Sequence, residues 1–260
     1  MAPLDHHRAG SGEPLVLIHG LGHSWRGWRP MLPHLERQFD VLAVDLPGFG
    51  RSAPLPERLE ATPETLADAV EDELARAGFI TAHLAGNSLG GWIALELARR
   101  GRARTVTAIS PAGLQHAREK PWGAAILRGM RWFARNAPPP APLIRNAAVR
   151  TFLAGPHLGR PWRSDPEELL ELARYFAACP GFDATLPTTF ESQPRGLTEL
   201  DVPVLLLWGR LDVILLPSQG RRFERLIPNA ELRYLPGLGH VPMSDDPELL
   251  AEAIAEFARA

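Results

Sequence analysis

Residues 83–98 read HLAGNSLGGWIALELA, and this stretch decides the fold. A short apolar strand leads into Gly-Asn-Ser-Leu-Gly, and a helical pattern follows at once. A strand, a sharp turn with a serine at its tip and a helix form the context in which Gly-x-Ser-x-Gly presents a nucleophile. The turn leaves no room for side chains two positions before or after the serine, which explains Gly86 and Gly90. We therefore predict that Ser88 is the catalytic nucleophile.

Apolar runs rich in branched residues recur along the chain between helical patterns, at residues 15–18, 41–44, 106–109 and 204–207. Continuous apolarity, rather than alternation, indicates strands that are covered on both faces. Because strands alternate with helices over tens of residues, we predict an α/β fold with an open, mostly parallel sheet and helices on both faces. Catalytic groups in such a sheet lie at the carboxyl ends of the strands.

The alternation of strands and helices breaks between residues 113 and 200. A proline run at residues 138–140 and three tryptophans replace the strand-like segments there. Asp165-Pro-Glu marks a helix start, and an earlier helix is expected from Trp122 to Arg135. We interpret the interval as an inserted helical lid. The predicted division is a core of residues 1–112 and 201–260 and a lid of residues 113–200.

A serine hydroxyl attacks only when a base removes its proton, and that base needs a third group that fixes its tautomer. His240 lies in Leu-Gly-His-Val-Pro, just before the C-terminal helix, and Asp212 follows a buried strand-like run. The order serine, aspartate, histidine is the one typical of this architecture. We predict His240 as the general base and Asp212 as the residue that orients it. Less suitable acids, because none closes a strand, are Asp183, Asp245 and Asp246.

Acyl transfer also needs two hydrogen-bond donors aimed at the oxyanion. One predicted donor is the N–H of Leu89, the residue after the serine. The other is the N–H of Leu21 in Leu-Ile-His-Gly-Leu-Gly, where glycines let the backbone approach the substrate. His19 in this loop is expected to hold the loop rather than to act as a base.

Five motifs together resemble the α/β-hydrolase superfamily: His19-Gly20, the stretch from Asp45 to Ser52, the serine pentapeptide, Trp208-Gly-Arg-Leu-Asp212 and Gly239-His240. The resemblance runs from about residue 15 to residue 257, apart from the lid. It implies the hydrolase fold and the triad. The same combination serves esterases, lipases, C–C bond hydrolases and cofactor-free haloperoxidases, so fold membership does not choose among them.

Three departures from the family pattern carry information. Family members usually have two more strands before His19-Gly20, whereas only 14 residues precede Leu15, so the first strand is expected to be truncated or absent. Ser88 occupies the nucleophile position that resembles an aspartate in haloalkane dehalogenases and epoxide hydrolases. The serine therefore argues against those two reactions. Asn87 is similar to an asparagine that shapes the polar pocket of meta-cleavage-product C–C hydrolases. Those enzymes carry tryptophan after the catalytic histidine, where Val241 stands.

The predicted lid helix carries an apolar stripe of Trp122, Ile126, Met130 and Phe133. If this stripe roofs the active site, Trp122, Met130 and Phe133 bind an apolar acyl or aryl group, with Asn87 as a further substrate-binding residue. The alternative is that the stripe only docks the helix on the sheet.

The opposite face of the same helix is predicted to carry Arg128, Arg131 and Arg135. Residues 113–164 hold nine basic residues against Glu119 alone. Such a face is either a solvated charged surface or a contact for an anionic membrane surface, and we favour the solvated surface.

Composition bounds the remaining possibilities. A chain of 260 residues can bury one sizeable core, and a net charge of −2 gives no sign of nucleic-acid binding. The N-terminus does not resemble a secretory signal, and no apolar run is long enough for a membrane span. The single cysteine, Cys179, cannot form an internal disulfide, and no zinc-ligand spacing occurs. We expect a cytoplasmic protein that needs no cofactor or metal.

The leading functional prediction is a serine hydrolase, a carboxylesterase, that acts on small esters of apolar acyl or aryl groups through an acyl-enzyme. The alternatives are C–C bond hydrolysis of the meta-cleavage-product type and cofactor-free haloperoxidase or perhydrolase chemistry. A non-catalytic alternative is a hydrolase-fold receptor or scaffold that binds a small ligand. The pattern makes no prediction of the oligomeric state.

Overall fold

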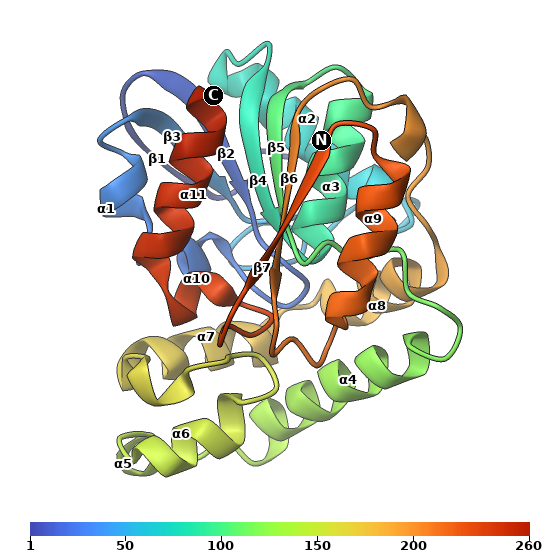
Figure 1. Ribbon diagram of the computed structural model, residues 1–260. Helices are drawn as coiled ribbons and strands as arrows, with labels where there is room; N and C mark the ends of the chain where they lie inside the picture. Colours follow the sequence, from blue (N-terminus) through green and yellow to red (C-terminus); the bar gives the residue numbers. More distant parts are fainter.

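A computed structural model describes residues 1–260, and a seven-stranded sheet forms its centre (Figure 1). The strand order is β1-β3-β2-β4-β5-β6-β7, and all neighbours run parallel except β1, which is antiparallel to β3. The predicted open, mostly parallel α/β sheet is confirmed. The strands are β1 His6–Gly10, β2 Glu13–Ile18, β3 Phe39–Val44, β4 Ala82–Asn87, β5 Ala103–Ile109, β6 Val204–Gly209 and β7 Ala230–Leu235.

Among residues 1–260, one strand precedes β2, where the resemblance to the family implies two. This strand, β1, pairs with β3 from His6 opposite Val44 to Gly10 opposite Asp40. It is the antiparallel edge of the sheet, and the parallel part begins at β3.

Helices cover both faces of the sheet. One face carries α2 Pro63–Ala77, α3 Leu89–Arg99 and α9 Gly220–Leu226, and the other carries α1 Leu32–Leu35, α10 Pro242–Asp245 and α11 Pro247–Arg259 (Figure 1).

Alternate residues of each central strand enter two separate hydrophobic cores. In β2, Val16 and Ile18 lie in the core beneath α2 and α3, while Leu15 and Leu17 lie in the core beneath α1 and α11. All four side chains are fully buried. The strand is therefore apolar at every position instead of alternating.

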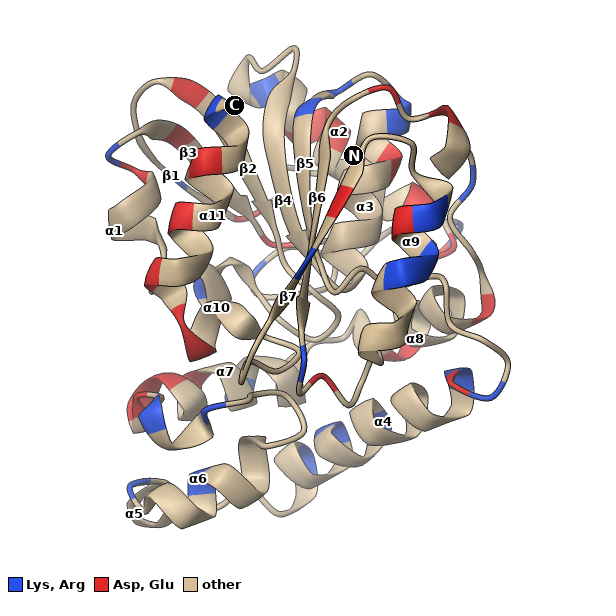
Figure 2. Ribbon diagram, viewed as in Figure 1, with Lys and Arg blue, Asp and Glu red and all other residues tan.

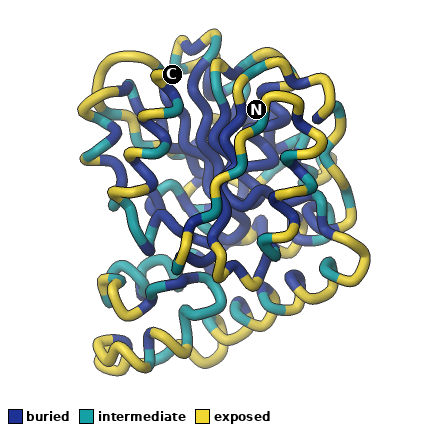
Figure 3. Tube along the Cα trace, viewed as in Figure 1, coloured by how far each residue is buried: buried dark blue, intermediate teal, exposed yellow.

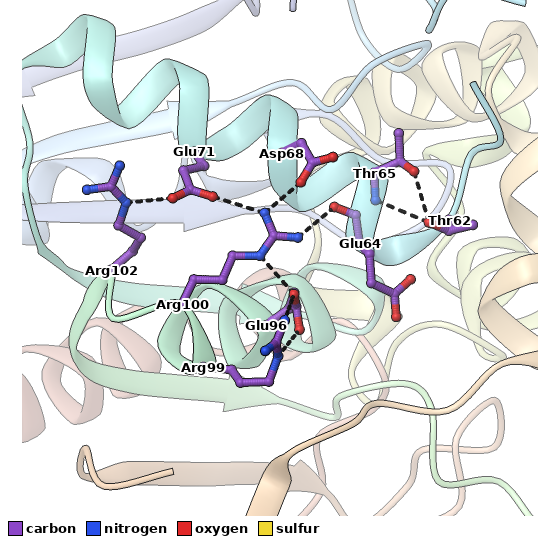
Figure 4. Close-up of polar contacts among 9 residues, drawn as sticks. All are labelled: Thr62, Glu64, Thr65, Asp68, Glu71, Glu96, Arg99, Arg100 and Arg102. Carbon is purple, nitrogen blue, oxygen red and sulfur yellow. Dashed lines mark hydrogen bonds and ion pairs between the residues drawn. The ribbon is translucent and has the colours of Figure 1, made fainter. Parts of the chain in front are cut away.

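Helix α2 begins after a threonine cap and is held to α3 by an arginine. Thr62 Oγ1 accepts the N–H of Thr65 at 3.1 Å, as expected for a residue before the first turn. Figure 4 shows the Arg100 guanidinium between three carboxylates. Its nitrogens lie 2.6 Å from Asp68, 2.9 Å from Glu71 and 2.8 Å from Glu96. These ion pairs join the end of α3 to the exposed side of α2.

The chain between β5 and β6 contains helices and no strand, and residues 113–200 are called the helical segment below. Figure 1 places these helices at the edge of the sheet where the parallel strands end. Phe182, Leu186 and Phe190 of its last helix join the core beneath α2 and α3. No helix of the protein combines the length and apolarity that crossing a membrane requires. The helices of the segment are α4 Lys120–Asn136, α5 Ala141–Ile144, α6 Ala147–Ala154, α7 Pro166–Ala178 and α8 Phe182–Glu191.

Helix α4 turns a different face to the protein from the one that its hydrophobic stripe predicts. Gly123, Ala124, Leu127 and Arg131 are buried, whereas Trp122 is 56% exposed. The prediction that Arg131 belongs to a solvated face is therefore wrong. The stripe that starts at Trp122 lies to one side of the contact with the core.

Close backbone approach and the contacts of the buried Arg131 explain this orientation. A Cβ on Gly123 would lie 2.8 Å from the Ile214 carbonyl oxygen, so only glycine lets α4 come this near. The Arg131 guanidinium donates to Cys179 Sγ at 3.0 Å, lies 3.3 Å from Asp183 and stacks 4.5 Å above the Phe182 ring. Both terminal nitrogens of this buried guanidinium therefore have partners inside the protein, whereas its Nε has none.

Candidate active site

Ser88 occupies the turn between β4 and α3 in a strained backbone conformation. Its φ is 56° and its ψ is −117°, and such geometry costs a non-glycine residue about 1–3 kcal/mol. A Cβ on Gly86 would lie 2.1 Å from the Gly90 oxygen, and a Cβ on Gly90 would lie 2.1 Å from the Ile18 oxygen. The turn therefore excludes any larger residue at both glycine positions.

His240 and Asp212 are joined by a short contact. His240 Nδ1 lies 2.7 Å from Asp212 Oδ2, and both side chains are buried. The other carboxylate oxygen accepts the N–H groups of Ile214 and Leu215, both at 2.9 Å. A carboxylate in this position keeps the imidazole proton on Nδ1, so Nε2 is free to accept a proton.

Ser88 and His240 line the same small cavity, whose volume is about 10 Å³. This is room for roughly one water molecule. The three residues predicted to be catalytic thus come together from the carboxyl ends of β4, β6 and β7. The other residues around the cavity are Gly20, Leu21, His23, Asn87, Leu127, His157 and Val241.

Two backbone N–H groups near Ser88 have no partner in the protein. Leu89 is the first residue of α3, so its N–H has no acceptor within the helix. The N–H of Leu21 makes no hydrogen bond either, and Leu21 lines the small cavity. Unpaired donors on both sides of a nucleophile are what a developing oxyanion requires.

His19 holds the loop that carries Leu21, as the sequence predicts. Its Nε2 accepts the N–H of Leu46 at 2.9 Å, and its Nδ1 donates to the Gly20 oxygen at 2.7 Å. Burial lowers the pKa of His19 to about 3, so the ring is neutral and both nitrogens are used. His19 therefore has no free nitrogen with which to act as a base.

Asn87 borders the small cavity, but its amide hydrogens are directed at the backbone. Its Nδ2 donates to the Ile109 oxygen at 3.2 Å and to the His240 oxygen at 3.0 Å. The side chain thus fixes the position of the His240 loop and has no amide hydrogen left for a substrate.

Asp245 binds the His240 loop, although the sequence gives it no role. Its Oδ2 accepts the N–H groups of Gly239 and Gly159, each at 2.8 Å, and its Oδ1 accepts the N–H of Arg160 at 2.7 Å. The carboxylate therefore ties the loop before His240 to the helical segment. In the sequence it stands beside a helix cap, and nothing there distinguishes it from a capping residue.

A second cavity of about 320 Å³ lies under the helical segment, and 14 of its 20 lining residues are hydrophobic. Two of the residues predicted to bind substrate, Met130 and Phe133, line it. Trp122 does not, because its indole N–H donates to the Val213 oxygen at 2.8 Å at the outside of the segment. The residue of α4 that borders the Ser88 cavity is Leu127 instead. The two cavities share His23, His157 and Val241.

A model of the alpha/beta hydrolase family matches residues 15–253 of this chain. The chain belongs to this family and is a hydrolase. Epoxide hydrolase EphH of Mycobacterium tuberculosis is 34% identical over 204 residues, which cover 74% of this chain and 92% of that protein. A pimeloyl-[acyl-carrier protein] methyl ester esterase of Edwardsiella ictaluri is 30% identical over 266 residues, covering 99% and 98% of the two chains. The structure of a thermophilic esterase from Thermogutta terrifontis is similar with a TM-score of 0.75 and 26% identity, covering 98% and 93%.

Two histidines outside the predicted triad separate the cavities of this hydrolase. The rings of His23 and His157 meet edge to face with their centroids 6.0 Å apart. Burial, and then the charge of protonated His240, lower the pKa of His23 to about 4, and burial lowers the pKa of His157 well below its usual value. Both rings are therefore neutral at pH 7. No sequence signal marks His157, which lies in a glycine- and proline-containing stretch of the segment.

Proposed function

We propose that this hydrolase is a carboxylesterase that cleaves esters of apolar acyl or aryl groups through an acyl-enzyme on Ser88. The observation that carries the proposal is the 2.7 Å contact between His240 and Asp212 beside the cavity that Ser88 lines. The pimeloyl-[acyl-carrier protein] methyl ester esterase and the thermophilic esterase, to which the chain is similar along nearly its whole length, support an ester substrate.

In the first half of the proposed reaction, Ser88 Oγ attacks the ester carbonyl carbon while His240 Nε2 takes the hydroxyl proton. The carbonyl oxygen becomes an anion and accepts the N–H groups of Leu21 and Leu89. Asp212 stabilises the imidazolium that has formed. His240 then returns the proton to the departing alkoxide, which leaves as the alcohol, and the acyl group remains on Ser88.

In the second half, water replaces the alcohol. His240 takes a proton from the water as its oxygen attacks the acyl carbon, and the same two N–H groups bind the second oxyanion. The proton then returns to Ser88 Oγ as the acid leaves. The cavity that Ser88 and His240 both line has a volume of about 10 Å³, the size of one water molecule, which suits this step.

The larger cavity supports an apolar acyl or aryl group. Its volume of about 320 Å³ lies at the lower end of the usual range for ligand pockets, roughly 300–1,000 Å³. Its lining is mostly hydrophobic, and the rings of His23 and His157 are neutral. The one charged side chain of the lining is that of Arg150, whose guanidinium donates to the backbone oxygens of Ile144, Arg145, Pro161 and Trp162. His23 and His157 line both cavities and are called the histidine wall below. An acyl chain that filled the larger cavity would place its carbonyl beyond this wall, next to Ser88.

The name of the M. tuberculosis relative raises epoxide hydrolysis as another activity. A serine alkoxide that opened an epoxide would form an ether, which water does not cleave under the conditions that hydrolyse an ester. A carboxylate nucleophile would form an ester, which can turn over. Ser88 at the turn therefore favours ester substrates in this chain.

Replacement of Ser88 tests the proposal. Ser88→Ala should lower kcat for p-nitrophenyl butyrate by about a thousandfold or more, with thermal unfolding unchanged. A fluorophosphonate should label Ser88 in the unaltered protein, located by mass spectrometry of its peptides. Ser218→Ala, at an exposed serine, is the matched control and should retain full turnover and labelling.

The same assay separates the alternatives. Full turnover by Ser88→Ala would show that the acyl-enzyme mechanism is wrong. Cleavage of a vinylogous diketo acid without ester cleavage would point to a C–C bond hydrolase. Peracid formation from acetate and hydrogen peroxide would point to perhydrolysis.

A further inference from the structure

All five exposed aromatic side chains of the protein lie in the helical segment. Figure 3 shows exposed chain along α4, α5 and α6, the layer farthest from the sheet. Exposed aromatic side chains gathered in one part of a protein indicate a surface that meets an apolar or amphipathic partner. They are Trp122, Trp132, Phe133, Phe152 and Trp162, with exposed fractions from 37% to 83%.

The same surface carries arginines that have no carboxylate partner. Arg128 and Arg135 of α4 are exposed and make no ion pair, and α4 contains no acidic residue. Trp132 lies four residues after Arg128 and three before Arg135, so the three side chains share one face of the helix. Figure 2 shows this run of basic positions along α4. The third arginine of α4, Arg131, lies 3.3 Å from Asp183, and Arg145 pairs with Glu167 at 3.5 Å at the border with α7.

The apolar cavity reaches this surface. Phe133 and Phe152 line the 320 Å³ cavity and are also 37% and 83% exposed. The hydrophobic lining is therefore continuous with the exposed aromatic surface. A chain that leaves the surface can enter the cavity without crossing a charged rim at these two residues.

We propose that the outer face of α4, α5 and α6 binds a lipid bilayer that contains anionic headgroups, and that the acyl chain of the substrate enters the cavity from this bilayer. Tryptophan favours the interface between headgroups and acyl chains, and arginine is attracted to anionic lipid. Helix α4 would lie in the plane of the surface, with Trp132 inserted between Arg128 and Arg135. The binding step stands alone, while the entry of an acyl chain rests on the proposed function.

A second copy of the chain fits this face less well. A two-fold interface would place the unpaired Arg128 and Arg135 of one copy near the same residues of the other, and like charges would meet without carboxylates between them. An anionic bilayer supplies the missing negative charge.

Sedimentation with vesicles tests the proposal on the full chain. The vesicles are pure phosphatidylcholine or an equimolar mixture of phosphatidylcholine and phosphatidylglycerol. We expect binding to the mixed vesicles that weakens as salt is added. Trp132→Ser and the double variant Arg128→Gln/Arg135→Gln should each weaken it, the double variant by tenfold or more because each arginine contributes about fivefold. None of these residues lines either cavity, so hydrolysis of soluble p-nitrophenyl butyrate should be unchanged.

Two substitutions at the opposite edge of the sheet are the matched controls. Ile80→Ser removes an apolar side chain that is 80% exposed, and Arg37→Gln removes an exposed arginine. Both should bind vesicles as the unaltered protein does. The proposal would be overturned if the Trp132 and arginine variants bound mixed vesicles as tightly as the unaltered protein. It would also be overturned if the unaltered protein did not bind mixed vesicles. The proposal would also be overturned if the unaltered protein formed a dimer, did not bind vesicles, and became a monomer on Trp132→Ser substitution.

The vesicle assay also distinguishes failure of this inference from failure of the proposed function. Ser88→Ala should bind mixed vesicles as the unaltered protein does, because binding needs no turnover. Vesicle binding without esterase activity would remove only the proposed reaction. Esterase activity without vesicle binding would remove only the membrane surface.

Discussion

Asp245 and Gly239 are joined by a 2.8 Å hydrogen bond that connects α10 to the loop of His240. Asp245→Asn keeps the size of the side chain but replaces one of the two oxygens that accept the N–H groups of Gly239, Gly159 and Arg160 by an NH2 group, which cannot accept. We expect kcat for a soluble ester to fall tenfold or more with little change in KM, because His240 loses its position. The free energy of unfolding should fall by about 1–3 kcal/mol.

Asp246→Asn is the control for this positioning role. Asp246 caps α11 and pairs with Arg160 at 2.8 Å, but it makes no contact with the His240 loop. Its replacement should lower stability and leave kcat unchanged. An equal fall of kcat in both variants would show that Asp245 acts only through stability.

Asp212→Asn should lower kcat by roughly a thousandfold to ten-thousandfold. The amide can still accept the N–H groups of Ile214 and Leu215 through its oxygen, while its NH2 would face His240 Nδ1 and favour the wrong tautomer. Stopped-flow or steady-state rates with p-nitrophenyl butyrate give the measurement. Asp201→Asn, at an exposed aspartate, is the control. A fall of less than tenfold would exclude Asp212 as the orienting acid.

His157→Ala should widen the passage between the two cavities, because His157 lines both. We expect kcat/KM for long or branched acyl esters to rise several-fold relative to p-nitrophenyl butyrate. A panel from butyrate to dodecanoate measures the shift. His34→Ala, on α1, lies outside both cavities and should leave the chain-length profile unchanged. An unaltered profile in His157→Ala would show that the histidine wall does not limit entry.

Acid should destabilise the fold through His23. Burial, and secondarily the charge of His240, lower its pKa from 6.5 to about 4. Above pH 6.5 both the folded and unfolded forms are neutral there. As the pH falls towards 4, the unfolded chain binds a proton that the folded chain excludes, so the free energy of unfolding decreases. The loss should reach roughly 2–3 kcal/mol near pH 4.5.

Urea unfolding of the unaltered protein and of His23→Phe, from pH 7.5 to 4.5, measures this term by difference. His19 acts in the same direction, whereas Asp45, whose pKa burial raises to about 6, binds a proton in the folded chain and acts in the opposite one. The Asp45 contribution cancels in the comparison, whereas the charge of His23 also lowers the pKa values of His19 and His157, so the difference includes this coupling. Parallel pH dependences in the two proteins would contradict the role of His23.

Arg100→Ala should cost about 1–3 kcal/mol of stability, because the guanidinium joins three carboxylates and is only 19% exposed. Arg100→Lys should lose less stability, since lysine keeps the positive charge but not the planar set of guanidinium N–H donors. Arg104 pairs with Glu13, which is 59% exposed, so Arg104→Ala should cost no more than about 0.5 kcal/mol. Thermal or urea unfolding compares the three. Equal losses for the two alanine variants would show that the network adds nothing.

The fold and the region around Ser88 are predictable because local rules determine them. Continuous apolar strands, a threonine cap at Thr62 and glycines on both sides of Ser88 each have one structural solution, and the structure has it. The residues after the ends of β4, β6 and β7 gather because parallel strands end at the same edge. The assignment of Ser88, Asp212 and His240 as catalytic stays a prediction until the variants are measured.

The helical segment is less predictable because its contacts depend on the partner and not on the pattern. The hydrophobic stripe of α4 lies to one side of the contact with the core, since Gly123 permits close approach and the guanidinium of Arg131 is buried against Cys179. His157 and Asp245 act through backbone groups far away in the sequence, which periodicity cannot identify.

The bond from Asp245 to Gly159 bears on any attempt to transplant the helices between β5 and β6. The N–H of Val241 also donates to the His157 oxygen at 3.0 Å, so residues 157–160 help to position the loop of His240. A chimera that exchanged the whole helical segment, residues 113–200, would also replace both of these contacts. A chimera that kept residues 155–160 and exchanged only α4 and α5 could acquire a new substrate range while His240 kept its position.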